Sequence, residues 1–223
     1  MRMNTTPQAT TILCYGASNT YGQKPDRSGR YAANERWTGI LQNALGSTFY
    51  IIEEGLNGRT TDLEHPNPTK PNRNGLTYFK ACLESHMPLS AIIVMLGTND
   101  LKTTYNRSAQ DIAEALRHYP EYVRELCTVR SLPMPKVILV SPPYMDSQAS
   151  QFINSMPTAG IYDETSDQKS HELGTFIEHV ALETDSLFLD AGPITRTGED
   201  GCHLDASSHT TLAAALQGLI ATD

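Results

Sequence analysis

The feature of this chain that most constrains its fold is a set of short, continuously apolar segments spaced along its length. They comprise residues 11–15, 49–52, 91–96 and 137–140, with a weaker fifth at 187–189. A strand with one solvent-exposed face alternates apolar and polar residues, whereas a continuously apolar strand is covered on both faces, as in a parallel sheet. The pattern therefore predicts five buried parallel strands.

Helical patterns fill the intervals between these strands. Apolar residues recur at helical spacing around residues 37–45, 76–83, 112–123, 173–180 and 212–220. Right-handed crossovers turn a repeated strand–helix order into a three-layer αβα sandwich with a central five-stranded parallel sheet, a flavodoxin-like α/β fold. Its ligand site lies beyond the carboxyl ends of the strands. Two stretches without periodicity, 23–35 and 142–165, are expected to shape a pocket or an oligomer contact there.

Several residues mark the ends of these helices. Ser108 and Asp111 form a capping box ahead of the third helix, and Asp205 is placed to cap the last one. Gly46 follows the first helix, at a position that favours glycine. Pro120 is expected to kink or split the third helix.

Charge and composition exclude several classes of partner. The 223 residues carry 25 acidic and 17 basic side chains, a net charge of −8, which repels phosphate backbones and anionic membranes. Residues 1–10 lack the apolar stretch of a secretory signal, and the run 91–96 is far shorter than the ~20 residues needed to cross a bilayer. We expect one domain over residues 1–223, a cytoplasmic location, and no nucleic-acid or membrane partner.

The first strand is followed by a turn of small residues, 16–22, which carries Ser18 where a nucleophile can stand. The turn has neither the lysine of a G-x-x-x-x-G-K-[ST] loop nor G-x-G-x-x-G spacing, so a flavodoxin-like nucleotide binder is the weaker alternative. It is not the G-x-S-x-G elbow either, because Thr20 stands where the second glycine would be. Taken alone, Ser18 is better explained as a structural residue.

An acid and a base stand three residues apart near the C-terminus, at Asp200 and His203. In a turn, the carboxylate can reach the imidazole, fix its tautomer and stabilise the imidazolium, which leaves the other ring nitrogen free to take a serine proton. His171, His179 and His209 lie in helical patterns and are interpreted as structural residues.

A zinc site at the same corner is an alternative. Cys202, His203, Asp205 and His209 all have side chains that ligate zinc, but their spacing fits no closed site and Asp205 is better placed as a helix cap. The four cysteines contain no C-x-x-C pair, which argues against a zinc ribbon and a disulfide framework. We therefore expect no metal.

Two further loops supply hydrogen-bond donors. Residues 55–61 follow the second strand and include Gly58, and residues 97–100 follow the third strand and include Asn99. A tetrahedral intermediate needs N–H groups aimed at its oxyanion, and a glycine amide and an asparagine side chain are suitable. Separately, the glycine could serve only a tight turn and the asparagine only a cap. Together with the serine and the histidine, they indicate an acyl-transfer site.

This set of residues resembles the SGNH, or GDSL-type, hydrolase family, whose Ser, Gly, Asn and His stand in four successive blocks. The resemblance implies Ser18 as nucleophile and first oxyanion amide, Gly58 as second amide, Asn99 as third donor, and His203 with Asp200 as the relay. It implies an acyl-enzyme mechanism without a cofactor, which slows on acidification because the histidine acts as a base. The residues expected to contact substrate are Asn19, Tyr21, Asn57, Thr98 and Leu204.

Further stretches resemble the bacterial arylesterase and acyltransferase branch of that family. They are residues 36–39, 53–56, 59–61, 95–100 and 141–143. The resemblance implies a serine esterase for short-chain aryl, alkyl or acetylated-sugar esters, with acyltransferase or perhydrolase side activity, and a homo-oligomer.

This chain departs from the family at Ala17, where an aspartate is usual. Because that aspartate is not the relay acid, we expect activity to survive with altered loop rigidity or substrate preference. Gln23 is polar where the branch has an aromatic gate, which argues against a strong transferase preference. The alternative to an enzyme is a non-catalytic carbohydrate- or ester-binding module with a degenerate pocket.

Overall fold

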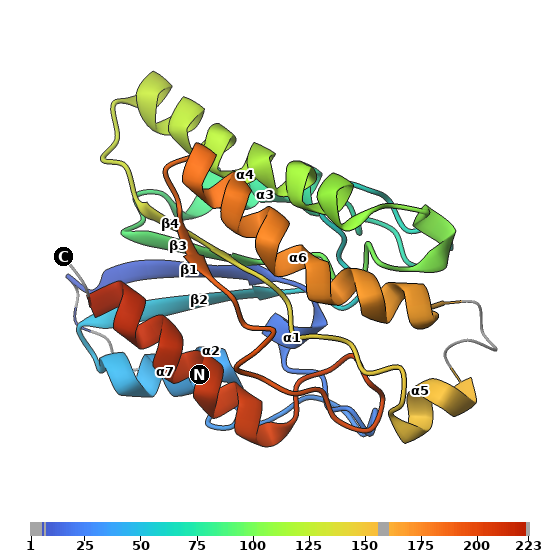
Figure 1. The fold of residues 1–223 in the computed structure, drawn as a ribbon. Helices are drawn as coiled ribbons and strands as arrows, with labels where there is room; N and C mark the ends of the chain where they lie inside the picture. Colours follow the sequence, from blue (N-terminus) through green and yellow to red (C-terminus); the bar gives the residue numbers. More distant parts are fainter. Residues whose placement is uncertain (1–5, 7, 156–160, 222–223) are drawn as a thin grey trace.

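The computed structural model describes residue 6, residues 8–155 and residues 161–221, with strands and helices alternating along the chain (Figure 1). In order, the elements are β1 (Thr10–Gly16), α1 (Ser18–Tyr21), α2 (Trp37–Leu45), β2 (Phe49–Gly55), α3 (Gly75–His86), β3 (Ala91–Met95), η1 (Thr103–Tyr105), α4 (Ala109–Arg130), β4 (Lys136–Val140), α5 (Ser150–Ser155), α6 (Glu164–Glu183), β5 (Leu187–Leu189) and α7 (Ala206–Ala221). The five strands and five longer helices match the predicted ones. The short helices α1, α5 and η1 carried no periodic signal.

All five strands form one parallel sheet in the order β2-β1-β3-β4-β5. The chain steps from β1 to β2 on one side, then crosses back over β1 to β3 and continues outward. In open sheets of this kind, the ligand crevice lies at the carboxyl ends of the two strands where the direction reverses, here β1 and β3. The predicted α/β fold with a five-stranded parallel sheet is confirmed.

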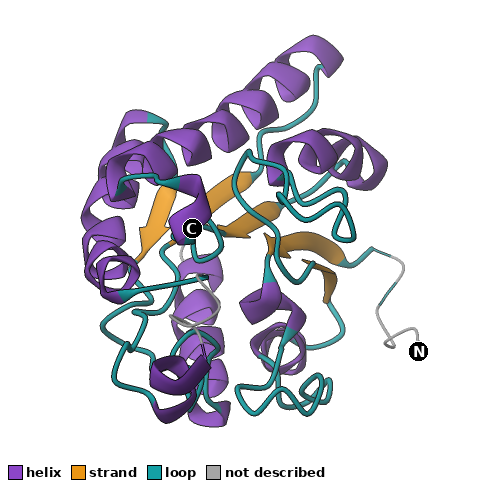
Figure 2. Ribbon diagram, turned by 90° about the vertical axis from the view of Figure 1, so that its right-hand side faces the viewer, coloured by secondary structure: helices purple, strands orange, loops and turns teal. Residues whose placement is uncertain are grey.

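Helices cover both faces of the sheet (Figures 1 and 2). α3, α4 and α6 pack on one face, and α2 and α7 pack on the other. Along β1, Leu13 and Tyr15 belong to the first core, while Ile12 and Cys14 belong to the second. Successive side chains of a strand point to opposite faces, so burial on both sides produces the continuous apolar runs in the sequence.

The helix ends follow the predicted signals. Ser108 and Asp111 form the capping box of α4, with the Asp111 N–H donating to Ser108 Oγ at 3.1 Å. Asp205 Oδ1 accepts from the backbone N–H three residues on at 2.7 Å, at the start of α7. The expected split at Pro120 is wrong, because α4 continues through it as one helix. The proline removes one helical hydrogen bond, and α4 packs against α6.

The two stretches predicted to be irregular differ. Residues 23–35 contain no helix or strand beyond an isolated bridge between Gln23 and Arg30. The stretch 142–165 includes α5 and the start of α6, and its residues 156–160 lie outside the described part. Among the helices of the described chain, none has the length and apolar character that a membrane crossing requires.

His209 is a fully buried histidine that joins α7 to α2. Its Nδ1 accepts the backbone N–H of Trp37 at 3.2 Å, so the neutral ring carries its proton on Nε2. The ring of Tyr31 meets it edge-on at 4.9 Å. Burial, with a smaller contribution from Arg36, lowers the pKa of His209 from 6.5 to about 4, although the charge of Asp205 opposes this. The fold therefore requires the neutral imidazole.

This requirement predicts acid lability. Between pH 6.5 and about 4 the unfolded chain binds a proton at His209 that the folded chain does not. The free energy of unfolding should therefore fall over this window, by as much as about 3 kcal/mol from this residue. Denaturant unfolding at several pH values should show a shallower fall for His209→Gln than for the wild type. His179→Gln, at an exposed histidine, is the control and should keep the wild-type slope. An unchanged slope in His209→Gln would contradict the assignment.

Candidate active site

The carboxyl ends of β1, β2 and β3 lie side by side at the same edge of the sheet. Gly16 at the end of β1 pairs with Gly55 of β2 on one side and with Met95 of β3 on the other. Three predicted site residues follow these ends within four positions, namely Ser18, Gly58 and Asn99. Parallel pairing therefore gathers residues from three loops at the switch point of the sheet.

The turn that carries Ser18 is unusually tight. A Cβ at Gly16 would lie 2.1 Å from Thr20 Oγ1 and 2.7 Å from the carbonyl oxygen of Met95, so only glycine fits. Ser18 opens α1 and is 7% exposed. Gly22 closes this helix at a φ of 85°, with its N–H donating to the Ser18 carbonyl at 2.8 Å. The serine thus stands on a rigid strand–helix turn.

Asp200 and His203 form a hydrogen-bonded pair in the loop between β5 and α7. The two groups meet at 2.5 Å between Asp200 Oδ2 and His203 Nδ1, while Asp200 Oδ1 accepts the N–H groups of Cys202 and His203 at 3.1 and 3.0 Å. Gly201 makes this turn possible with a φ of 67°. Burial by itself would raise the pKa of Asp200, but the hydrogen bonds and the histidine outweigh it and lower the pKa. The carboxylate is therefore charged at neutral pH and faces the imidazole.

The side-chain amide of Asn99 is held in one orientation. Its Nδ2 donates to the carbonyl oxygen of Arg59 at 3.0 Å, and Lys102 Nζ donates to its Oδ1 at 2.8 Å. An ammonium group can only donate, so the lysine identifies the oxygen end of the amide. The amide nitrogen has a second hydrogen that can serve a ligand. On the neighbouring loop, Gly58 adopts a φ of 84°, a left-handed conformation that favours glycine.

These residues share one cavity of about 510 Å³. Ser18, Gly58, Asn99 and His203 all line it, and Asp200 is buried behind the histidine. Within the described chain, no hydrogen bond joins Ser18 to His203. In unliganded enzymes such bonds are often long and tighten only when substrate binds.

The residues predicted to contact substrate divide into two groups. Asn57 and Thr98 line the cavity. Tyr21 is not among the residues that line this cavity, and its ring carries the guanidinium of Arg30 at 4.4 Å from the centroid. Gln23 lines the cavity and accepts a hydrogen bond from Asn57 Nδ2 at 2.9 Å. These two side chains form a polar pair at the position where the sequence has a polar residue in place of an aromatic one.

Asn19 and Leu204, also predicted to contact substrate, are not among the residues that line this cavity. Asn19 Oδ1 accepts the N–H of Leu204 at 2.9 Å, and its Nδ2 donates to the carbonyl of Cys202 at 3.2 Å. Leu204 is fully buried in the core beneath α2 and α7. Asn19 therefore connects the serine turn to the histidine loop, and its polar atoms are already used. Sequence spacing could not reveal this contact, because it joins residues 183 and 185 positions apart.

The residues considered for zinc serve other purposes. Asp205 caps α7, and His209 accepts from the N-terminus of α2. Cys202 is buried 3.5 Å from His203 Nδ1, and burial, together with the charge of Asp200, raises its thiol pKa well above the ordinary value. The thiol therefore stays protonated, which makes it a poor nucleophile.

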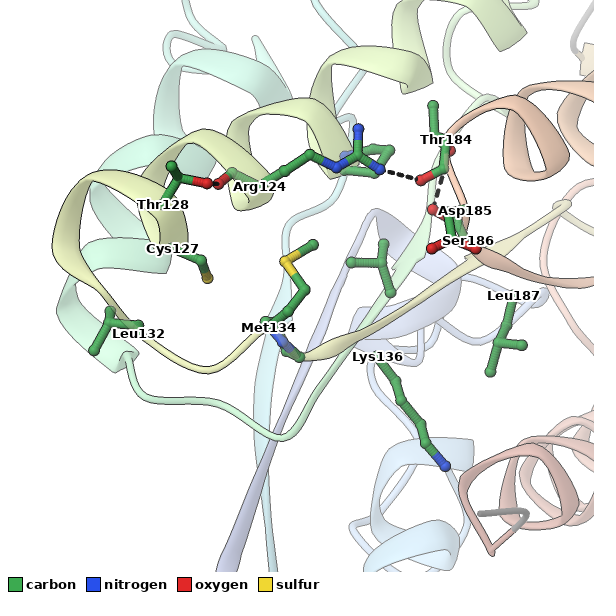
Figure 3. Close-up of a pocket in the computed structure, with 13 residues that line it drawn as sticks. Arg124, Cys127, Thr128, Leu132, Met134, Lys136, Thr184, Asp185, Ser186 and Leu187 are labelled. Atoms are coloured by element: carbon green, nitrogen blue, oxygen red, sulfur yellow. Dashed lines mark hydrogen bonds between the residues drawn. The ribbon is translucent and has the colours of Figure 1, made fainter.

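A second cavity, of about 560 Å³, lies at the amino ends of β4 and β5 (Figure 3). There the guanidinium of Arg124 donates to the carbonyl of Thr184 at 2.6 Å. Ser186 and Cys127 are also present, but no histidine lines this cavity, and burial raises the pKa of the Cys127 thiol. The described lining of this cavity therefore lacks the histidine base of a serine hydrolase.

Sequence reasoning missed the charged lining of the first cavity. Its cationic residues are Arg27, Lys70, Arg73 and Lys102. They stand in loops without periodicity, where a single sequence gives no face or direction to a side chain. The one available signal was proximity, since Lys102 follows Asn99 by three residues.

Solved structures similar to this chain include two bacterial enzymes. The native aryl esterase of M. smegmatis is 36% identical, with a TM-score of 0.84 over 95% of this chain and 98% of that one. A carbohydrate acetylesterase from Sinorhizobium meliloti is 35% identical, with a TM-score of 0.85 over 95% and 98% of the two chains. No curated protein matches the sequence.

Fold, site and relatives define the class of this protein as a carboxylic ester hydrolase of the SGNH type. The model of the GDSL-like lipase/acylhydrolase family matches residues 14–211. The chain belongs to that family.

The bridge made by Asn19 leads to a prediction. Asn19→Ala removes two buried hydrogen bonds and leaves a backbone N–H without its partner, so the free energy of unfolding should fall by about 1–3 kcal/mol. Because the serine turn and the histidine loop lose their connection, kcat for ester hydrolysis should fall more than KM changes. Asn43→Ala, at an exposed position on α2, is the control and should alter neither quantity appreciably. Wild-type stability and kcat in Asn19→Ala would show that the bridge does not position the site.

Proposed function

We propose that Ser18, His203 and Asp200 form the catalytic triad of an esterase that hydrolyses short-chain carboxylic esters. The observation that carries this proposal is the buried, charged Asp200 at 2.5 Å from His203 Nδ1, with the histidine and the serine lining one cavity. This pairing places the proton of neutral His203 on Nδ1 and leaves Nε2 as the base.

The first half of the reaction forms an acyl-enzyme. His203 Nε2 takes the proton of Ser18 as Oγ bonds to the ester carbonyl carbon, and Asp200 stabilises the resulting imidazolium. The carbonyl electron pair moves to oxygen, where the N–H groups of Ser18, Gly58 and Asn99 Nδ2 are the proposed donors. When the tetrahedral intermediate collapses, the carbon–oxygen bond to the alcohol breaks, and the alcohol leaves with the proton from His203.

Water repeats these steps on the acyl-enzyme and releases the acid. An alcohol or peroxide that replaces water would give the acyltransferase or perhydrolase side activity. The printed names of the two relatives favour aryl esters and acetylated sugars among the short-chain substrates. The free, buried cysteines are compatible with the cytoplasmic location predicted from the sequence, which remains a prediction, as does the homo-oligomer.

The first test is hydrolysis of a p-nitrophenyl ester series from acetate to decanoate. Wild-type turnover should be highest for acetate or butyrate and should fall by roughly a thousandfold or more in Ser18→Ala. Ser85→Ala, at an exposed serine on α3, is the matched control and should keep wild-type activity. A fluorophosphonate should label the wild type and Ser85→Ala but not Ser18→Ala. Equal turnover in the wild type and Ser18→Ala would rule out this nucleophile.

Alanine substitutions at two glycines, one in the cavity and one outside it, test the second oxyanion donor. Gly58→Ala puts a side chain on a residue with a φ of 84°, which costs about 1–2 kcal/mol or displaces the amide. We expect kcat to fall about tenfold or more, because one donor is misaligned. Gly46→Ala also strains the backbone, at a φ of 75° and a ψ of −166° outside the cavity, where a Cβ meets no atom within 4 Å. This variant should lose stability but keep kcat, whereas equal kcat in both variants would remove Gly58 from the oxyanion site.

A further inference from the structure

The cavity that holds the proposed triad is strongly cationic. Arg27, Lys70, Arg73 and Lys102 line it, and no aspartate or glutamate of the described chain does. The protein as a whole has 17 basic and 25 acidic side chains, a net charge of −8. Four of the 17 basic residues therefore face one cavity in an acidic protein, a distribution that general surface charge does not explain.

These cations come from three separate loops. Arg27 lies in the loop after α1, Lys70 and Arg73 lie between β2 and α3, and Lys102 follows β3. Loops so far apart in sequence meet here only because the strands end at the same level. The charges therefore converge on the site through the fold rather than through a local basic run.

Two of the cations stand beside the proposed oxyanion donors. Lys102 Nζ lies 2.8 Å from Asn99 Oδ1. Arg73 Nε donates to the carbonyl of Asn57 at 2.8 Å, and a Cβ built on Gly58 would lie 3.5 Å from that same nitrogen. Positive charge is thus held close to the position of the ester.

Lys70, Arg73 and Lys102 form no ion pair within the described part of the chain. Among the residues that the structure describes, none offers a carboxylate within ion-pair distance of Lys70, Arg73 or Lys102, and the Arg73 guanidinium donates to carbonyl groups. Glu64 accepts only the backbone N–H of Arg73, at 3.0 Å. Burial, the charge of Lys70 and, more weakly, that of Arg73 together lower the pKa of Lys102 to about 8. Asp100 and Cys202 act in the opposite direction and raise this pKa. The cations therefore repel one another and would be stabilised by an added anion.

We infer that the substrate of this esterase is itself anionic, an ester that carries a carboxylate within reach of Lys70, Arg73 and Lys102. The inference rests on the proposed function, since it assigns a substrate class to the same cavity. A charged cleft with low-dielectric walls concentrates ligands of opposite charge and raises their association rates. The carboxylate can belong to the alcohol part, as in an acetylated acidic sugar, or to the acyl part, as in a monoester of a dicarboxylic acid.

Matched substrate pairs test the inference and separate these two sources. In the alcohol arm, 4-acetoxybenzoate is compared with the neutral 4-acetoxybenzamide. In the acyl arm, monoethyl succinate is compared with the neutral ethyl succinamate, with acid release followed at constant pH. We expect kcat/KM to favour the anionic member about tenfold or more in one arm. The preference should shrink as salt rises from about 50 to 500 mM, because salt screens the attraction.

Substitutions assign the preference to the cavity. Lys70→Gln and Arg73→Gln should each reduce the anionic-to-neutral ratio several-fold, and Lys70→Arg, which keeps the charge, should retain it. Lys80→Gln, at an exposed lysine on α3 outside the cavity, is the control and should leave the ratio at its wild-type value.

The outcomes are distinguishable. If the neutral esters are hydrolysed with a ratio near one in both arms, the inference is wrong and the esterase proposal stands. A ratio that Lys70→Gln and Arg73→Gln leave unchanged would also overturn the inference, because the preference would then come from elsewhere. If neither member of either pair is hydrolysed, the proposed function fails and the inference fails with it.

Discussion

The parallel pairing of β1 with β2 and β3 is the constraint on which the site depends. It places Gly16, Gly55 and Met95 side by side, so the three following loops leave the sheet at one level. A register shift of one residue would turn every inward side chain of a strand to the other face. Because both faces are buried beneath helices, that shift would place mismatched side chains in both cores. The packing that stabilises the fold therefore also aligns the site.

The fourth loop reaches the site from the other end of the chain and is held by hydrogen bonds rather than by the sheet. Asn19 binds the backbone of the histidine loop at Cys202 and Leu204, and the Leu204 side chain anchors that loop in the core. His209 adds a second connection, from α7 to the start of α2. These contacts are polar and buried, so each is costly to leave unsatisfied and each limits the geometry that the loop can adopt.

Electrostatics divides the cavity into two parts. Asp200 is charged and buried behind His203, where hydrogen bonds lower its pKa despite desolvation. The cavity lining carries arginine and lysine, and Lys102 both contributes charge and orients the amide of Asn99. A negative group thus faces the imidazole while positive groups face the ligand. This arrangement suits a reaction in which an imidazolium and an oxyanion develop together.

The sequence by itself determined the strands, the longer helices and the fold, because continuous apolar runs and capping residues such as Ser108 and Asp205 are local signals of burial and of helix ends. It also identified Ser18, Gly58, Asn99, Asp200 and His203 as candidates, because their order matches a family motif and each follows a predicted strand. Only the tertiary structure decided which neighbours face the cavity. Asn19 and Leu204 stand beside candidate residues yet serve the scaffold, and the cations of irregular loops line the site. Side-chain direction in a loop depends on contacts between residues far apart in the chain, and these contacts exist only once the sheet has brought the loops together.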